Sequence, residues 1–251
     1  MNSRLRASFL QHGVAALFTA STVCATTLRA QDPPPPKPQE LSADLGFVST
    51  SGNSKITTLN VGEKLIVRRG RFEHRQQFGS VFAEEDGKQT SNLLFANVRS
   101  DFALNKRIAI FAYVGFDRNQ FAGIERRFEE ALGLAVKLIN TKTNQWNAEA
   151  GLGLTQQLST LDSTRNFISL RTGTTFKHYF SKSAYFLQGI EYLPSLDVAE
   201  DYRINSETAV VAPLSTHIAM KFGYTIRFDN LPEAESVKSD RILTAGLQFN
   251  W

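Results

Sequence analysis

Ser215 and His217 are the two residues of this chain whose types and spacing come closest to a catalytic pair. They lie two positions apart, so in a strand both side chains would project from the same face. A serine next to a histidine is the arrangement that many hydrolases use to make a nucleophile. No third residue that could orient the histidine is evident. We therefore interpret the pair as part of a polar belt at the end of a strand, with a lipid-modifying hydrolase as the weaker alternative.

The other histidines and the single cysteine do not point to a catalytic or metal site either. His178 lies between Phe176 and Phe180 on an apolar face, and His74 has no second metal ligand at a useful spacing. Cys24 lies in a segment that we expect to be removed. The sequence has no phosphate loop, zinc pattern, nucleophile elbow or dinucleotide motif. We therefore expect no catalytic residue, no metal, no cofactor and no enzymatic activity.

Charged side chains are the more informative polar residues, because they recur at alternate positions of apolar segments and so share one face of each. The candidates are Arg99, Asp101, Glu149, Arg171, Lys177, Glu191, Lys221 and Arg227, with Asp44, Lys64 and Asp229 in the same phase. Unpaired buried charge is costly, so mixed charges inside a narrow space usually pair. An ion-paired plug is the favoured interpretation, and a small hydrophilic pore lined by these charges is the alternative.

The first 30 residues predict a cleaved signal peptide. Arg4 and Arg6 precede an apolar run that is too short to span a membrane as a helix. Cleavage after Ala30 is preferred, cleavage after Ala25 is the alternative, and lipidation of Cys24 is disfavoured by its neighbours. The segment holds three cationic and no acidic residues, so its removal lowers the formal net charge from +4 to +1. The basic composition therefore does not indicate nucleic-acid binding.

A short proline-rich segment, residues 31–40, follows the signal peptide and includes four consecutive prolines. Such a run favours an extended polyproline II conformation. We interpret it as a spacer that lies in the periplasm.

From Leu41 onward the chain alternates apolar and polar residues without a sustained helical period. We expect about twelve strands, at 41–51, 56–69, 72–84, 91–105, 107–120, 127–140, 143–158, 166–180, 183–196, 204–213, 216–230 and 241–251. Most are long enough to cross a bilayer when tilted. Tight turns alternate with longer loops, which we place near 85–90, 121–126, 160–165, 198–203 and 231–240. This is the plan of an outer-membrane barrel, and an even strand number places both termini in the periplasm.

The last strand carries the sharpest alternation. Leu243, Ala245, Leu247, Phe249 and Trp251 share one face, and the chain ends on that aromatic residue. Outer-membrane barrels close in this way, with an interfacial aromatic residue at the end of the closing strand. We therefore take Phe249 and Trp251 as a candidate signal for the barrel-assembly machinery.

The order of several short motifs resembles the YdiY-like family of outer-membrane proteins described as salt-induced (domain of unknown function 481). The motifs are Thr50-Ser51-Gly52-Asn53-Ser54, the hairpin Lys64–Phe72, Tyr113-Val114-Gly115-Phe116, Arg118-Asn119-Gln120-Phe121-Ala122-Gly123, and the strands of Gly133, Gly151 and Gly153. The resemblance covers nearly all of 41–251. It implies a barrel in the outer membrane and no established activity or site residues.

Together these patterns predict an all-β chain: an antiparallel transmembrane barrel of about 12 strands over residues 41–251, of the outer-membrane type. We expect a monomer in the bacterial outer membrane, with lipid and the assembly machinery as its partners. The expected role is envelope integrity, a stress-related role, or a narrow hydrophilic pore. A protein that presents its loops for binding is the alternative, and the lipid-modifying hydrolase ranks third.

Overall fold

The computed structural model describes residues 37–49, 56–233 and 236–251, so the predicted signal peptide and most of the proline-rich spacer lie outside the described residues. The strands are β1 (Gln39–Ser49), β2 (Ile56–Arg69), β3 (Phe72–Glu85), β4 (Lys88–Ala103), β5 (Ile108–Asn119), β6 (Ile124–Asn140), β7 (Asn144–Ser159), β8 (Thr164–Tyr179), β9 (Tyr185–Pro194), β10 (Tyr202–Pro213), β11 (Ile218–Asp229) and β12 (Ser239–Asn250). A short 3₁₀ helix, η1 (Gln120–Ala122), follows β5.

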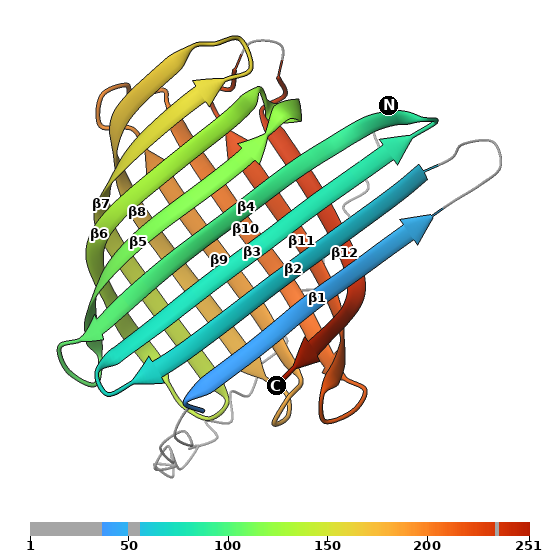
Figure 1. Cartoon of the computed structure of the whole chain (residues 1–251). Helices are drawn as coiled ribbons and strands as arrows, with labels where there is room; N and C mark the ends of the chain where they lie inside the picture. Colours follow the sequence, from blue (N-terminus) through green and yellow to red (C-terminus); the bar gives the residue numbers. More distant parts are fainter. Residues whose placement is uncertain (1–36, 50–55, 234–235) are drawn as a thin grey trace, which may run out of the picture. The chain divides into compact units, whose positions relative to one another are not determined.

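The twelve strands form one closed antiparallel barrel in which each strand pairs with its sequence neighbours and β1 pairs with β12 (Figure 1). The predicted fold class and strand number are therefore confirmed. In the described part of the chain, no helix has the length and apolar character needed to cross a membrane.

Alternation along each strand puts apolar side chains outside the barrel and polar side chains inside, the reverse of a water-soluble protein. Val98 and Arg99 are adjacent in β4, yet Val98 is 51% exposed and Arg99 only 8%. The closing strand repeats the pattern, with Leu243 exposed and Gln248 buried. The faces assigned from the sequence are therefore those of the folded chain at these positions.

Two connections and the start of the first strand differ from the prediction. The loop expected near 85–90 is wrong, because β3 and β4 are joined by Asp86 and Gly87 alone, both at positive φ. This is the two-residue hairpin turn that Asp-Gly favours. The loop expected near 121–126 ends earlier than predicted, because the strand β6 begins at Ile124. The helix η1 before it is capped by Gly123, which has a φ of 73°. The first strand starts at Gln39, inside the segment predicted as a spacer.

The barrel closes between β1 and β12 over a short stretch. Five positions pair there, from Ser42 opposite Asn250 to Gly46 opposite Gly246, whereas eleven positions pair between β1 and β2. The backbones of Leu41 and Trp251 exchange two further hydrogen bonds, of 3.3 and 2.9 Å. Both described termini therefore lie at the same end of the barrel, which we call the terminal end; the opposite end, where β11 ends and β12 begins, is the loop end.

Candidate functional site inside the barrel

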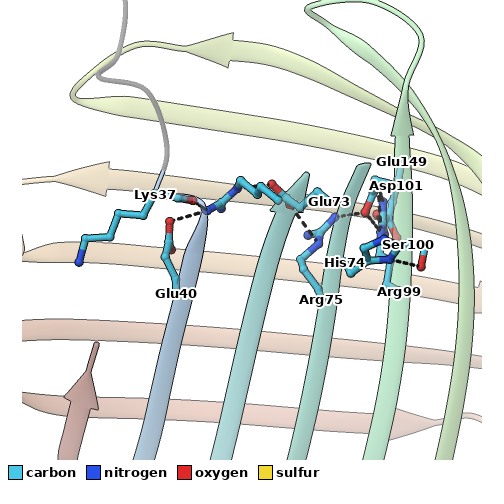
Figure 2. Close-up of polar contacts among 10 residues, drawn as sticks. Lys37, Glu40, Glu73, His74, Arg75, Arg99, Ser100, Asp101 and Glu149 are labelled. Carbon is cyan, nitrogen blue, oxygen red and sulfur yellow. Dashed lines mark hydrogen bonds and ion pairs between the residues drawn. The ribbon is translucent and has the colours of Figure 1, made fainter. Parts of the chain in front are cut away.

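A chain of ion pairs, which we call the charged ladder, runs along the inner wall from the terminal end toward the middle of the barrel. Its members, in order of contact, are Glu40, Arg68, Glu73, Arg75, Asp101, Arg99, Glu149, Arg171 and Glu191. Figure 2 shows the part between Glu40 and Glu149, which passes across β1 to β4 and then reaches Glu149 of β7. Positive and negative groups alternate along the ladder, so each charge has an opposite charge beside it.

Arg99 is the central member of the charged ladder. Its Nε and Nη2 donate to the carboxylate of Asp101 at 3.0 and 2.9 Å, and its Nη1 donates to Glu149. The guanidinium also lies 4.1 Å from the centre of the Phe111 ring, a cation–π distance. Arg99 belongs to β4 and Glu149 to β7, which are not paired strands, so this contact passes through the barrel interior.

Arg171 of β8 is the next member of the charged ladder after Glu149. Its side chain is bonded to Glu149, at 3.4 Å, and to Glu191. Its guanidinium lies 4.1 Å from the centre of the Tyr113 ring, which comes from β5. Arg171 of β8 thereby contacts side chains from both of its neighbouring strands, β7 and β9, and from β5, with which β8 does not pair.

A second group, the loop-end cluster, crosses the barrel near the opposite end. It consists of Asp117, Arg127, Glu129, Gln157, Arg203 and Asp229. Arg203 of β10 pairs with Glu129 of β6, and Arg127 of β6 lies 3.8 Å from Asp229 of β11. These strands are far apart around the barrel, so their side chains meet over the lumen.

The space around the loop-end cluster is densely filled. Arg127, Arg203 and Gln157 are all buried, and Gln157 also donates a hydrogen bond to Glu233, which lies beyond the end of β11. A cavity of about 10 Å³ next to Glu129 is the size that one water molecule needs. The described side chains therefore leave little room for a solute at this level.

The lysines lie in a more open part of the lumen, closer to the terminal end. Lys221 donates to Asp44 at 2.6 Å and lies 3.9 Å from Glu207. The side chain of Glu207 is 50% exposed although it lies on the inner face. Lys177 has its ammonium 3.8 Å from the centre of the Tyr185 ring. Water therefore reaches the inner wall here.

Lys64 lies among these groups without an ion pair or hydrogen bond to any residue that the structure describes. Arg75, Lys177 and Lys221 are the cations close enough to repel it, and Glu207 is the anion that attracts it. Two of these cations have carboxylate partners of their own, Arg75 with Asp101 and Lys221 with Asp44.

The sequence-predicted lumen residues divide among these groups. Arg99, Asp101, Glu149, Arg171 and Glu191 are brought together in the charged ladder, and Lys177 and Lys221 lie in the open part. Arg227 of β11 forms no ion pair with a described residue, and its guanidinium lies 5.3 Å from the centre of the Phe95 ring of β4. Sequence reasoning missed Arg127, Glu129 and Arg203, although Arg127 and Glu129 have the same two-residue spacing as the residues that it selected.

The candidate hydrolase pair is not assembled. Ser215 Oγ accepts hydrogen bonds from the backbone N–H groups of His217 and Ile218, at 3.3 and 3.2 Å, which places it in the turn between β10 and β11. His178 and His74 have ring nitrogens within 2.7 and 2.8 Å of Asn144 and Ser100, respectively. Among the residues that the structure describes, no group of three His, Cys, Asp or Glu is placed to hold a metal.

Comparisons with known proteins agree with the fold. The family model described as "Protein of unknown function, DUF481" matches residues 43–251. The Escherichia coli (strain K12) protein named "Uncharacterized protein YdiY" is 22% identical over 216 residues, 85% of this chain and 84% of that protein. The translocator domain of autotransporter NalP from Neisseria meningitidis is 10% identical, with a TM-score of 0.51 over 86% of this chain and 89% of that one. The NanC porin gives 10% identity and a TM-score of 0.48, over 83% and 97%. The NalP match shows a shared barrel fold.

Proposed function

We infer that this chain, which belongs to the DUF481 family, is a non-enzymatic outer-membrane barrel whose lumen is held closed by side chains that cross it. The observation that carries this proposal is the loop-end cluster, in which Arg203 of β10 meets Glu129 of β6 over the lumen. A solute that passed this level would have to separate two buried, oppositely charged side chains. Separating such a pair is costly because each charge would be left in a poorly hydrated place.

The outer membrane is the location that the surface of the barrel fits best. Its outer face exposes large apolar side chains along every strand, which would aggregate in water but are stable against lipid. Phe249 and Trp251 stack at 6.1 Å on that face, beside the terminal end. The barrel fold that the chain shares with the translocator domain of autotransporter NalP is compatible with this proposal.

Envelope integrity, including a stress-related role, is the function that a closed barrel of this kind can serve. The connections at the loop end range from two residues, between β3 and β4, to nine, between β11 and β12. Connections of this length form no folded binding unit of their own, so they weigh against a protein that works by presenting its loops. Ser215 Oγ accepts hydrogen bonds from backbone N–H groups of the turn, and no hydrogen bond to the His217 ring is found among the described residues, which weighs against a lipid-modifying hydrolase.

Two measurements test this proposal. The mature chain should fractionate with the outer membrane and migrate faster in detergent gels when unheated than when boiled. Vesicles that contain the folded barrel should swell in solutions of small sugars no faster than vesicles without protein. Recovery of the chain as a soluble periplasmic protein would contradict the barrel in the membrane, and fast swelling would contradict the closed lumen.

A narrow hydrophilic pore is the second candidate, because part of the lumen is open to water. The half-exposed Glu207 and the unpaired Lys64 lie on the inner wall, where a small charged solute could bind. This candidate requires the loop-end cluster to open. Fast, size-limited swelling in the experiment above would favour it over the closed barrel.

A further inference from the structure

A carboxylate lies on the outer, lipid-facing side of the barrel, halfway between its ends. Glu63 is flanked on the same face of β2 by Val61 and Leu65, and it is the eighth of the 14 residues of that strand. Its directly paired neighbours are Ala43 of β1 and Phe78 of β3. Charged side chains on the lipid face are destabilising, most of all near the middle of the bilayer. The position of Glu63 therefore needs an explanation that packing inside this barrel does not supply.

An amide lies next to this carboxylate. Gln76 of β3 is exposed on the same outer face and pairs directly with Leu65 of β2, two residues from Glu63. Figure 1 shows β1 to β4 tilted in the same direction. Gln76, which pairs with Leu65, is the diagonal neighbour of Glu63 on the outer face, on the terminal-end side of Phe78. The two polar groups therefore lie on adjacent strands of the same face.

Neither group is hydrogen-bonded within the described part of the chain. The outward amide of Gln188 in β9, by contrast, is hydrogen-bonded at both of its polar atoms. Its Nε2 donates to Ser206 Oγ at 3.1 Å, and its Oε1 accepts from Thr208 Oγ1 at 2.6 Å. Glu63 and Gln76 instead line a hollow of about 540 Å³ on the outer face, together with apolar side chains such as Phe78 and Val98. Lipid tails cannot hydrogen-bond, so lipid alone would leave both groups unsatisfied.

We propose that this face of β2 and β3 is the interface with a second copy of the chain. A two-fold axis parallel to the barrel axis and passing between the two strands would place β2 of each copy opposite β3 of the other. Glu63 of one copy then faces Gln76 of the second copy, and Gln76 faces Glu63 of the second copy. Each amide donates to the opposite carboxylate, and the surrounding apolar side chains pack against one another.

A second copy fits this face better than another occupant because the two unsatisfied groups complement each other. The amide supplies a donor, the carboxylate supplies acceptors, and the two-fold axis uses both at once. This dimer replaces the monomer expected from the sequence, and it rests on the proposed location in the outer membrane. It does not depend on whether the lumen conducts.

Cysteine cross-linking in cells tests the geometry directly. Two differently tagged full-length chains carry Cys24→Ala, and one adds Glu63→Cys while the other adds Gln76→Cys. Co-expression should give a mixed disulfide dimer in the outer-membrane fraction, and one Gln76–Glu63 contact stays in place to hold the copies together. The matched control pairs Glu63→Cys with Ile190→Cys, which is also outward-facing but on β9. Equal yields from the two pairs would overturn the proposed interface.

Energy transfer between labelled barrels in vesicles tests the polar contact. The double variant Glu63→Leu with Gln76→Leu should lower the dimer association constant by roughly tenfold, because two membrane-buried hydrogen bonds are lost. Glu63→Gln should retain the dimer, since an amide can still accept, and Gln188→Leu should leave it unchanged.

The heat-dependent gel shift separates this proposal from the one on location. A chain that shifts but stays monomeric at high protein-to-lipid ratio would overturn the dimer alone. Equal dimerisation of the double leucine variant would also overturn it. A chain that shows no shift would overturn the barrel and the dimer together.

Discussion

Arg99 illustrates how individual residues hold this barrel together. Its side chain bonds to Asp101 and Glu149 from two strands that do not pair, and all three side chains are at most 17% exposed. In such surroundings a charge is stabilised mainly by its partners, because water screens and solvates it only weakly. The stability of the lumen therefore depends on complete pairs rather than on the number of charges.

Arg99→Leu should lower the free energy of unfolding by about 3 kcal/mol, because Asp101 and Glu149 would lose the cation between them. The measurement is urea unfolding of the refolded barrel in detergent micelles, followed by tryptophan fluorescence. Arg69→Leu is the matched control, since Arg69 is exposed at the end of β2. Equal losses in the two variants would contradict a structural role for the Arg99 pairs.

At the residue scale, alternation in the sequence put some charges on one face, but it did not find Arg127, Glu129 and Arg203, and it did not show which charges meet. The two-residue spacing of Arg99 and Asp101 put both on one face, and they are in contact. Arg203 and Glu129 are 74 residues apart, and their contact depends on how twelve strands close into a barrel. Local alternation holds no information on that closure, so the loop-end cluster could not be predicted.

Within a strand, the outer face requires apolar side chains, whereas the inner face requires small or polar ones. In β11, Phe222 is 51% exposed on the outer face, while the inward neighbour Gly223 is buried. The alternation continues along the strand, with Ile226 outward and Arg227 directed toward Phe95 across the lumen. The effect of a substitution on stability should therefore alternate between outward-facing and inward-facing positions along the strand.

Phe222→Arg should destabilise the barrel in lipid by about 2–4 kcal/mol, because a cation would face the acyl chains near the bilayer midplane. Thr225→Arg, on the inner face of the same strand, should cost less. Spin labels placed singly at 221–228 should alternate between contact with lipid-dissolved oxygen and contact with a polar quencher. Uniform water exposure, or a period near 3.6 residues, would contradict the assigned faces.

The junction of β1 and β12 includes a close backbone approach. A Cβ atom added to Gly246 would lie 2.2 Å from the carbonyl oxygen of Leu45, too close for any side chain. Gly246→Ala should therefore slow closure of the barrel and lower the yield of the fast-migrating gel species. Gly223→Ala is the control, because its added Cβ would lie 3.7 Å from its nearest neighbour. Equal yields of the two variants would show that this approach does not limit closure.

The aromatic end of β12 is expected to act during assembly. Replacing Phe249 and Trp251 together by Ser should reduce the assembled fraction and leave the chain open to periplasmic proteases, because the closing strand would lose its interfacial anchor. Pulse-chase labelling with a gel-shift readout measures this. Normal assembly of the double variant would exclude these residues as the assembly signal.

Most strands could be placed from the sequence because each one alternates over its whole length. The turn at Asp86 and Gly87 was missed for a physical reason. The run from Glu85 to Thr90 is polar and looks like a loop, but strands at the loop end extend beyond the apolar band, where polar residues are tolerated. The Asp-Gly pair is itself a hairpin signal and could have corrected the prediction.

At the scale of the molecule, the described strands form a barrel with an unequally filled lumen. Charged and polar side chains fill the loop end, whereas water reaches the inner wall at Glu207. The fold class and the two faces followed from the sequence. The unequal filling did not, because it depends on side chains from opposite walls meeting at one level.

Single-channel recording of the purified barrel in a planar bilayer tests the closed lumen most directly. The wild-type barrel should show no stable open level, because Arg203 and Glu129 bridge the lumen between β10 and β6. Arg203→Ala should show discrete openings, since the bridge is lost while the strands keep their pairing. A steady current through the wild-type barrel that Arg203→Ala leaves unchanged would contradict the account.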